Sequence, residues 1–326
     1  MVKYLKDVIS DFGANIISSV ITDNASTMQS AWRKLVDARE MGDTWHILFM
    51  SCSCHMLHNY VGLVLKSSYY EPAFTLVKSI LKQLRKLPFR KYYIRHVRAL
   101  SCPHIPFYTK IRWGSAEVVV NFVAKHIDIL IEYFQTSNAK EFKVIRTNLL
   151  NLKDTVYRLD KLLKRIILSI RHLEGQERWI CDSYYELGKL RYYMQIHHAD
   201  QPDLLVKYDK MWNRSYSDIT LLGVLLSPYY FNVLLNKNNT ENRYLSSNIN
   251  VNSNDFKNAV TWIKQLAFPA GVSDSQWADI WKRYQSQIKS LKFGRIRRHK
   301  IVLDTKPLLN GTTHDAESYL ESIKSC

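Results

Sequence analysis

The alternation of apolar and polar positions predicts two strands and two helices near the start of the chain. Two short runs, IISSVIT (16–22) and HILFMS (46–51), have the β-branched and aromatic content of buried strands. Each is followed by a segment, 25–40 or 55–68, in which apolar residues recur every three or four positions, as on one face of a helix. This strand–helix–strand–helix order is typical of a parallel α/β unit, which we place at residues 1–70.

After residue 70 the helical period dominates. The predicted helices cover residues 74–87, 115–135, 155–174, 178–196, 255–267 and 274–291. The stretch 236–255, rich in asparagine and serine, predicts a mobile loop. The predicted fold class is therefore mainly α with a small α/β part. Its domains are an α/β part (1–70), a helical domain (71–235), the polar loop, and C-terminal helices with a basic tail (256–326).

Composition narrows the function classes. The chain has 326 residues, of which 46% are hydrophobic, but it has no apolar run long enough to span a membrane. Five unevenly spaced cysteines do not form a disulfide framework, which favours a reducing compartment, nuclear or cytoplasmic. The formal net charge of +17 favours a polyanionic partner, because Lys and Arg attract phosphate.

The positive charge is concentrated in a segment without acidic residues. Residues 72–115 contain ten Lys or Arg and no Asp or Glu, and KQLRKLPFRKYYIRHVR (82–98) holds seven of the ten. These seven candidate nucleic-acid-binding residues are Lys82, Arg85, Lys86, Arg90, Lys91, Arg95 and Arg98. Phe89, Tyr92 and Tyr93 lie between them, where aromatic rings stack on bases in many nucleic-acid-binding proteins.

The alternative interpretation of this segment is a helix face that simply carries lysine and arginine into solvent. A second basic cluster, KFGRIRRHK (292–300), is a candidate nucleic-acid contact or nuclear localisation signal. The chain has no recognisable zinc finger or helix-turn-helix, so the sequence favours binding of DNA or RNA without sequence specificity.

Three short motifs, in order, resemble the hAT family of DNA transposases and related transposon-derived domains. They are a strand ending in Thr22-Asp23-Asn24-Ala25 with Met28, then Cys52, His55 and Leu57, then Arg112-Trp113-Gly114-Ser115. Ile111 stands where the family usually has threonine before this last box. The resemblance covers roughly residues 10 to 235, and its specificity comes from the order and spacing of the three motifs.

The resemblance implies an RNase H-like fold, here a partial core, interrupted by a helical insertion. Family members hold two Mg²⁺ ions with an Asp, Asp, Glu set and use them to attack a phosphodiester. Asp23 matches the second aspartate of that set, at the end of a strand. The alternative role for Asp23, together with Asn24, is to cap the following helix.

The other two carboxylates of the set have no match in this sequence. The family's first aspartate lies well upstream of the TDNA motif, whereas this chain begins 22 residues before Asp23. Asp7 and Asp11 fall in a predicted helix, and Glu317 and Glu321 lack the flanking residues of the family's glutamate. We therefore expect a truncated or domesticated fragment that is inactive alone. It would bind Mg²⁺ for catalysis only if a complete site were assembled.

Two further site interpretations stay open at this point. Cys52, Cys54, His55 and His58 lie close enough in sequence to suggest zinc, although the crowded spacing is equally compatible with a packed cysteine and a hydrogen-bonded histidine. In the family, the tryptophan that corresponds to Trp113 lies near the active site, so Arg112 and Trp113 are candidates for a DNA contact. The alternative is that Trp113 anchors the first long helix of the helical domain.

Three function hypotheses follow. The first is an inert transposase-like fragment with non-specific DNA or RNA binding. The second is a helical protein–protein interaction module that pairs, as a homo- or hetero-oligomer, with transposase-like chains. The third is an active metal-dependent phosphodiester transferase completed by a partner chain. Salt-sensitive binding separates the first from the second, and metal binding separates the third from both.

Overall fold

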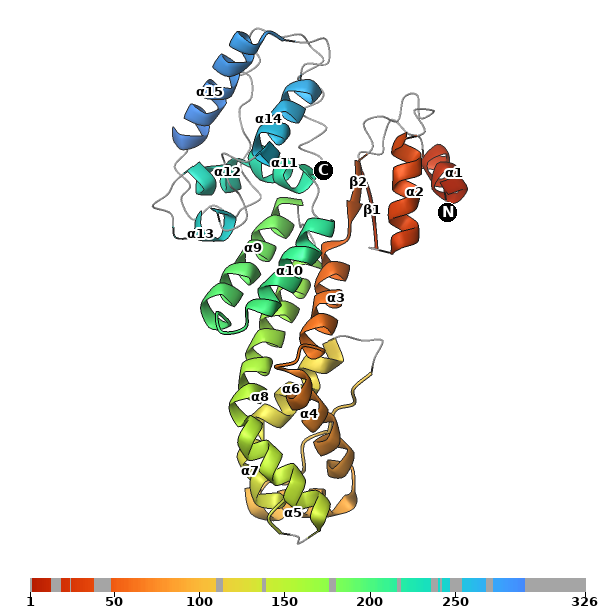
Figure 1. Ribbon diagram of the computed structural model, residues 1–326, viewed down its shortest axis with the longest axis vertical. Coiled ribbons are helices and arrows are strands. Elements are labelled where there is room, and N and C mark those ends of the chain that lie inside the picture. The colour runs from red at the N-terminus through yellow and green to blue at the C-terminus, as the bar shows by residue number, and fades with distance from the viewer. Residues whose placement is uncertain are drawn as a thin grey trace. The chain divides into compact units, whose positions relative to one another are not determined.

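The computed structural model describes residues 2–12, 19–23, 25–37, 48–109, 114–136, 139–175, 180–215, 218–235, 240, 242–246, 254–267 and 272–290. The fold is mainly helical, and its described strands form one two-stranded parallel sheet (Figure 1), which confirms the predicted class at this level. Two compact units divide the chain. The first comprises Met1–Ser53, Gly175–His197 and Trp212–Cys326, and the second comprises Cys54–Glu174 and His198–Met211. These units cut across the boundaries at 70 and 235 that the sequence suggests.

The predicted α/β arrangement is present in the first unit. Strands β1 (Ser19–Thr22) and β2 (Leu48–Ser51) pair in parallel, with Ser19 opposite Leu48 and Thr22 opposite Ser51. Parallel pairing needs a crossover connection, and α2 (Ser26–Asp37) lies within it. Helix α1 (Val2–Phe12) packs beside α2 around buried Leu5, Ala31 and Leu35 (Figure 1).

Six further helices belong to the first unit. They are α9 (Ile180–His197), α11 (Asp218–Leu226), α12 (Pro228–Leu235), α13 (Asn242–Ser246), α14 (Asn254–Ala267) and α15 (Asp274–Ser290). Their core includes buried Tyr184, Tyr185, Val224 and Phe231. Helices α14 and α15 confirm the two predicted C-terminal helices.

Helix α13 is a difference from the sequence prediction, because it lies inside the 236–255 stretch that reads as a loop. The Asn242 amide nitrogen donates hydrogen bonds to the carbonyls of Val233 and Leu234, 2.9 and 2.8 Å away, at the end of α12. Leu245 is fully buried. One amide and one leucine therefore hold a short helix in a segment whose composition is otherwise that of a loop.

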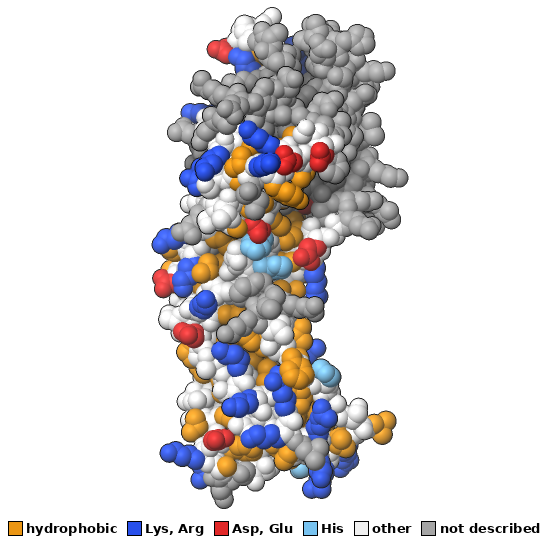
Figure 2. Space-filling model, turned by 90° about the vertical axis from the view of Figure 1, so that its right-hand side faces the viewer, with side chains coloured by type: hydrophobic (Ala, Val, Ile, Leu, Met, Phe, Trp, Pro, Cys, Tyr) orange, Lys and Arg blue, Asp and Glu red, His pale blue; other side chains and the backbone are white. Residues whose placement is uncertain are grey.

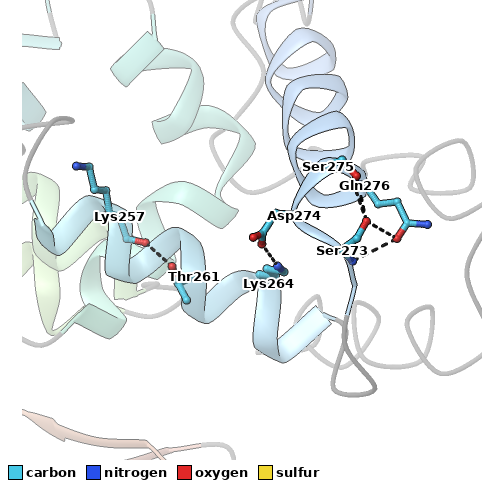
Figure 3. Close-up of polar contacts among 7 residues, drawn as sticks. All are labelled: Lys257, Thr261, Lys264, Ser273, Asp274, Ser275 and Gln276. Carbon is cyan, nitrogen blue, oxygen red and sulfur yellow. Dashed lines mark hydrogen bonds and ion pairs between the residues drawn. The ribbon is translucent and has the colours of Figure 1, made fainter.

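The start of α15 is fixed by a reciprocal cap (Figure 3). The backbone N–H of Gln276 donates to Ser273 Oγ (3.3 Å), and the backbone N–H of Ser273 donates to Gln276 Oε1 (3.2 Å). This capping box satisfies two N–H groups that a helix end leaves without partners. Lys264 Nζ, near the end of α14, forms an ion pair with Asp274 at 2.5 Å.

The second unit is built around one long helix. Its helices are α3 (Ser53–Leu65), α4 (Glu71–Leu84), α5 (Leu87–Val97), α6 (Gly114–Lys125), α7 (Ile127–Tyr133), α8 (Lys140–Leu173) and α10 (Pro202–Ser215), of which α10 belongs as far as Met211. Helix α8 packs against α4, α6 and α7 (Figure 1). The predicted helix 115–135 is divided at His126, and α8 begins before the predicted residue 155.

Polar contacts attach the segment 198–211 to the other helices of this unit. The Arg158 guanidinium donates to both carboxylate oxygens of Asp200, at 2.6 and 2.7 Å, and to the Tyr69 hydroxyl at 2.8 Å. The buried Tyr60 hydroxyl donates to the Leu204 carbonyl at 3.0 Å. Among the helices that the structure describes, none is long and apolar enough to cross a membrane.

Candidate nucleic-acid interface

The seven basic residues predicted from the sequence form one exposed set, which we call the basic surface: Lys82, Arg85, Lys86, Arg90, Lys91, Arg95 and Arg98. They lie on the last turn of α4, on α5 and on the residues that flank α5. Figure 2 shows Lys and Arg side chains over the lower part of one face, at the height of α4 and α5 in Figure 1, with hydrophobic side chains between them. These seven of the predicted nucleic-acid-binding residues are therefore accessible, whereas Arg112 and Trp113 lie outside the described ranges.

Local sequence explains why α5 begins and ends where it does. Lys86 is extended, as the residue before the helix, and Pro88 occupies the first turn, where a missing N–H costs nothing. Arg98 ends the helix in a left-handed conformation with φ of 51°. The last turn carries Arg95 and His96, which complement the negative end of the helix dipole.

The packing of α5 decides which side chains face solvent. Phe89 and Tyr93, four residues apart, are 0% and 8% exposed, and the Phe89 ring lies 5.0 Å from that of Tyr133 on α7. The tyrosine ring of Tyr92 stacks on His96, with centroids 3.8 Å apart. The expectation that Phe89 and Tyr93 stack on bases is therefore wrong, because helical spacing places both in the core.

The positive charges of the basic surface are not neutralised by the described residues around them. In the part of the chain that the structure describes, none of these seven cations forms an ion pair with a carboxylate. Two acids from neighbouring helices come near. Glu141 accepts a hydrogen bond from Gln83, and burial together with the Glu132 charge raises the pKa of Tyr92. The surface thus keeps its charge available for an anionic ligand.

The sequence interpretation missed an exposed aromatic ring next to these cations. Phe107 is 60% exposed, and the Arg85 guanidinium lies over its ring, 3.9 Å from the centroid. Arg85 also donates to the Pro106 carbonyl at 3.2 Å. The sequence signal was IPFYT (105–109), where a proline follows a buried isoleucine and directs the chain away from helix.

Asp23 stands at the carboxyl end of β1, as predicted, and its side chain is exposed. One carboxylate oxygen accepts the backbone N–H of Ala25 at 3.1 Å, just before α2. This i, i+2 contact is an Asx turn, which orders the chain just before α2 without capping the N–H groups of the helix itself. Over the described ranges, no three His, Cys, Asp or Glu side chains come together in a group suited to a metal. Asp7 and Asp11 lie on a helix, α1, as predicted, and both are exposed.

The Cys52–His58 segment runs from the end of β2 into the first turns of α3. The backbone N–H of Cys52 donates to the Thr22 carbonyl at 2.8 Å and so extends the strand pairing by one residue. The thiols of Cys52 and Cys54 are reduced, and both are half-buried, like His55 and His58. All four are described residues, and they do not form a three-ligand group.

Several predicted residues lie outside the described ranges: Asn24, Ile111, Arg112, Trp113, Glu317, Glu321 and the cluster 292–300. Thr109 and Ser115, which lie before and after the Arg112–Trp113 segment, are joined by two hydrogen bonds. Ser115 Oγ donates to the Thr109 carbonyl at 2.9 Å and accepts the Thr109 N–H at 3.0 Å. Gly114 and Ser115 open α6.

The chain matches no protein-family model, no curated protein and no solved structure. The hAT resemblance therefore rests on the three sequence motifs.

Proposed function

We propose that this chain binds nucleic acid through the basic surface of α4 and α5, without sequence specificity. The observation that carries the proposal is the set of seven exposed cations that, between described residues, have no carboxylate partner. Such cations neutralise phosphates and release the counterions condensed on the strand, so binding is favourable at low salt and weakens as salt rises.

We further propose that the chain derives from a hAT-type transposase and is catalytically inert by itself. The three motifs support this origin, and so do the parallel strand–helix–strand arrangement and the position of Asp23 at a strand end. A two-metal site takes several carboxylates as oxygen ligands. Since Asp23 has no two companions among the described residues, the residues present do not fit such a site, and no catalytic step is assigned to it.

The test of nucleic-acid binding is a charge-removing triple variant, Arg90→Gln/Lys91→Gln/Arg95→Gln. We expect its affinity for a fluorescent DNA strand, measured by anisotropy, to fall by about tenfold or more, because three phosphate contacts are lost. The matched control, Lys161→Gln/Arg171→Gln/Lys210→Gln, removes the same charge from exposed positions on α8 and α10. An equal loss in both variants would mean that net charge, rather than this surface, drives binding.

A further inference from the structure

Phe107 is displayed to solvent by the chain on either side of it. Ile105 is 3% exposed, Pro106 is buried, and the half-buried ring of Tyr108 meets Phe74 edge-on, with centroids 5.1 Å apart. The segment is neither helix nor strand, and these neighbours anchor it on the helices. Because the residues before and after Phe107 point inward, its ring points outward.

The Phe107 ring is also held in place from one side. Arg85 lies over the ring, and its guanidinium is itself fixed by the Pro106 carbonyl. A cation over an aromatic face is favourable, and here it covers one face of a ring that is still 60% exposed. The remaining aromatic surface is preorganised, so a ligand that covers it does not have to immobilise a mobile side chain.

We propose that Phe107 stacks on an unpaired base, so that the basic surface selects single-stranded over double-stranded nucleic acid. This inference rests on the proposed function and adds the ligand class to it. In this proposal the exposed cations of α5 contact successive phosphates, and a base stacks on the free face of Phe107 beside Arg85. Proteins that bind single strands combine the same two kinds of contact. In a duplex both faces of each internal base are covered by neighbouring bases, which leaves no partner for the ring.

Binding to an anionic membrane is an alternative role for the same surface, because exposed apolar side chains lie beside the cations. Ile94, Val97 and Leu100 are 42%, 43% and 105% exposed. Basic and apolar side chains together also suit an anionic membrane surface. The position of Arg85 over the Phe107 ring favours nucleic-acid binding over membrane binding. Inserting this ring into lipid would carry the Arg85 charge toward the hydrocarbon.

The experiment compares Phe107→Ala, Phe107→Leu and Phe107→Trp on an oligothymidylate of about 16 nucleotides and on a duplex of equal length. We expect Phe107→Ala and Phe107→Leu to weaken single-strand binding by about 5- to 150-fold, with an unchanged salt slope. Phe107→Trp should retain the affinity, and duplex binding should be the same in all variants. The ring is exposed, so these changes leave the fold intact, which circular dichroism checks.

The outcomes separate this inference from the proposed function. If the unmodified chain binds neither ligand, both fail. If the Arg90/Lys91/Arg95 variant loses binding while Phe107→Ala keeps it, only the stacking proposal fails. Full affinity of Phe107→Leu, or full affinity for a strand of abasic sites, would also overturn stacking. Phe107-dependent binding to phosphatidylserine vesicles, without an effect on oligothymidylate, would assign the surface to membranes instead.

Discussion

At the scale of single residues, Asp23 shows how one position supports two interpretations. A carboxylate at the end of a parallel strand is where metal-dependent phosphodiester enzymes place a ligand, and the sequence motif points there. The same carboxylate accepts the Ala25 N–H before α2. The two roles respond differently to substitution, because an amide can replace the hydrogen bond but not the negative charge.

We expect Asp23→Ala to destabilise the α/β part by about 0.5–1.5 kcal/mol, the usual net contribution of one hydrogen bond. Asp23→Asn should stay within about 0.5 kcal/mol of the unmodified chain, because its carbonyl oxygen accepts the same N–H. Urea unfolding followed by circular dichroism measures both. Calorimetric titration with Mg²⁺ provides the second readout, and tight binding that both substitutions abolish would overturn the purely turn-forming role of Asp23 and the inert assignment together.

The Arg158–Asp200 pair predicts a pH dependence. The hydrogen bonds from Arg158 hold the pKa of the Asp200 carboxyl well below its ordinary value of 3.8. A carboxyl whose pKa is lowered on folding stabilises the fold above its ordinary pKa, and this stabilisation disappears as the pH falls below it.

The unmodified chain should therefore be more stable than Asp200→Asn at neutral pH, and the difference should shrink as the pH falls below about 4. Thermal unfolding at a series of pH values gives this comparison. Asp203→Asn, an exposed position on the next helix, is the control. A difference that is constant from neutral to acidic pH would show that the ion pair does not contribute.

At the scale of helices and strands, hydrophobic periodicity predicted the presence of these elements better than their first and last residues or the faces that they bury. Both strands and the helices at 255–267 and 274–291 follow from it. The break at His126 does not, because the apolar period continues through it on both sides. The prediction that Phe89 and Tyr93 stack on bases is wrong because the two rings are four residues apart, the spacing of a buried helix face. The charged residues between them lie on other faces of the same helix.

Phe107 is the converse case, an exposed aromatic side chain that the sequence did not identify. It lies in a stretch without periodicity, so no pattern distinguishes an aromatic ring that is buried from one that is displayed. Its exposure depends on the inward packing of its neighbours, and its orientation on Arg85, which follows α4 and lies 22 positions away in sequence. Contacts of this kind are set by tertiary packing, which local pattern does not encode.

The close packing of α9 and α11 gives a prediction at this scale. A Cβ atom at Gly223 would lie 3.1 Å from the Ile180 side chain and 3.2 Å from the Cys181 backbone nitrogen. We expect Gly223→Val to destabilise the first unit by about 1–3 kcal/mol through overpacking. Gly114→Val is the matched control, because a Cβ there meets nothing within 4 Å. Comparable urea midpoints for the two variants would contradict the close approach of these helices.

At the scale of the whole molecule, the units are not continuous in sequence. Helices α9 and α11 fall within the predicted domain 71–235, yet they belong to the first unit, where α9 also packs with α13 from outside that range. Each boundary inferred from composition assumed that neighbours in sequence share a core. Contacts between distant segments decide otherwise, and a single sequence carries no direct record of them.

The net charge of +17 is a property of the entire chain, but its consequence depends on where the charge lies. In the second unit, seven cations lie on α4, on α5 and beside α5. The ion pairs of that unit, among described residues, instead join α8 to α7, join α8 to Asp200 or lie within α8. The charge therefore acts as a surface that can bind a polyanion, and binding through it must depend on salt.

The most direct test of this account is the salt dependence of binding to a fluorescent oligothymidylate, for the unmodified chain and for Arg90→Gln/Lys91→Gln/Arg95→Gln. The account predicts that the logarithm of the binding constant falls linearly with the logarithm of salt concentration. Each phosphate neutralised contributes a slope of about −0.7, so the triple variant should reduce the slope by about two. Binding that does not change with salt, or an identical slope in the variant, would contradict nucleic-acid binding through the basic surface.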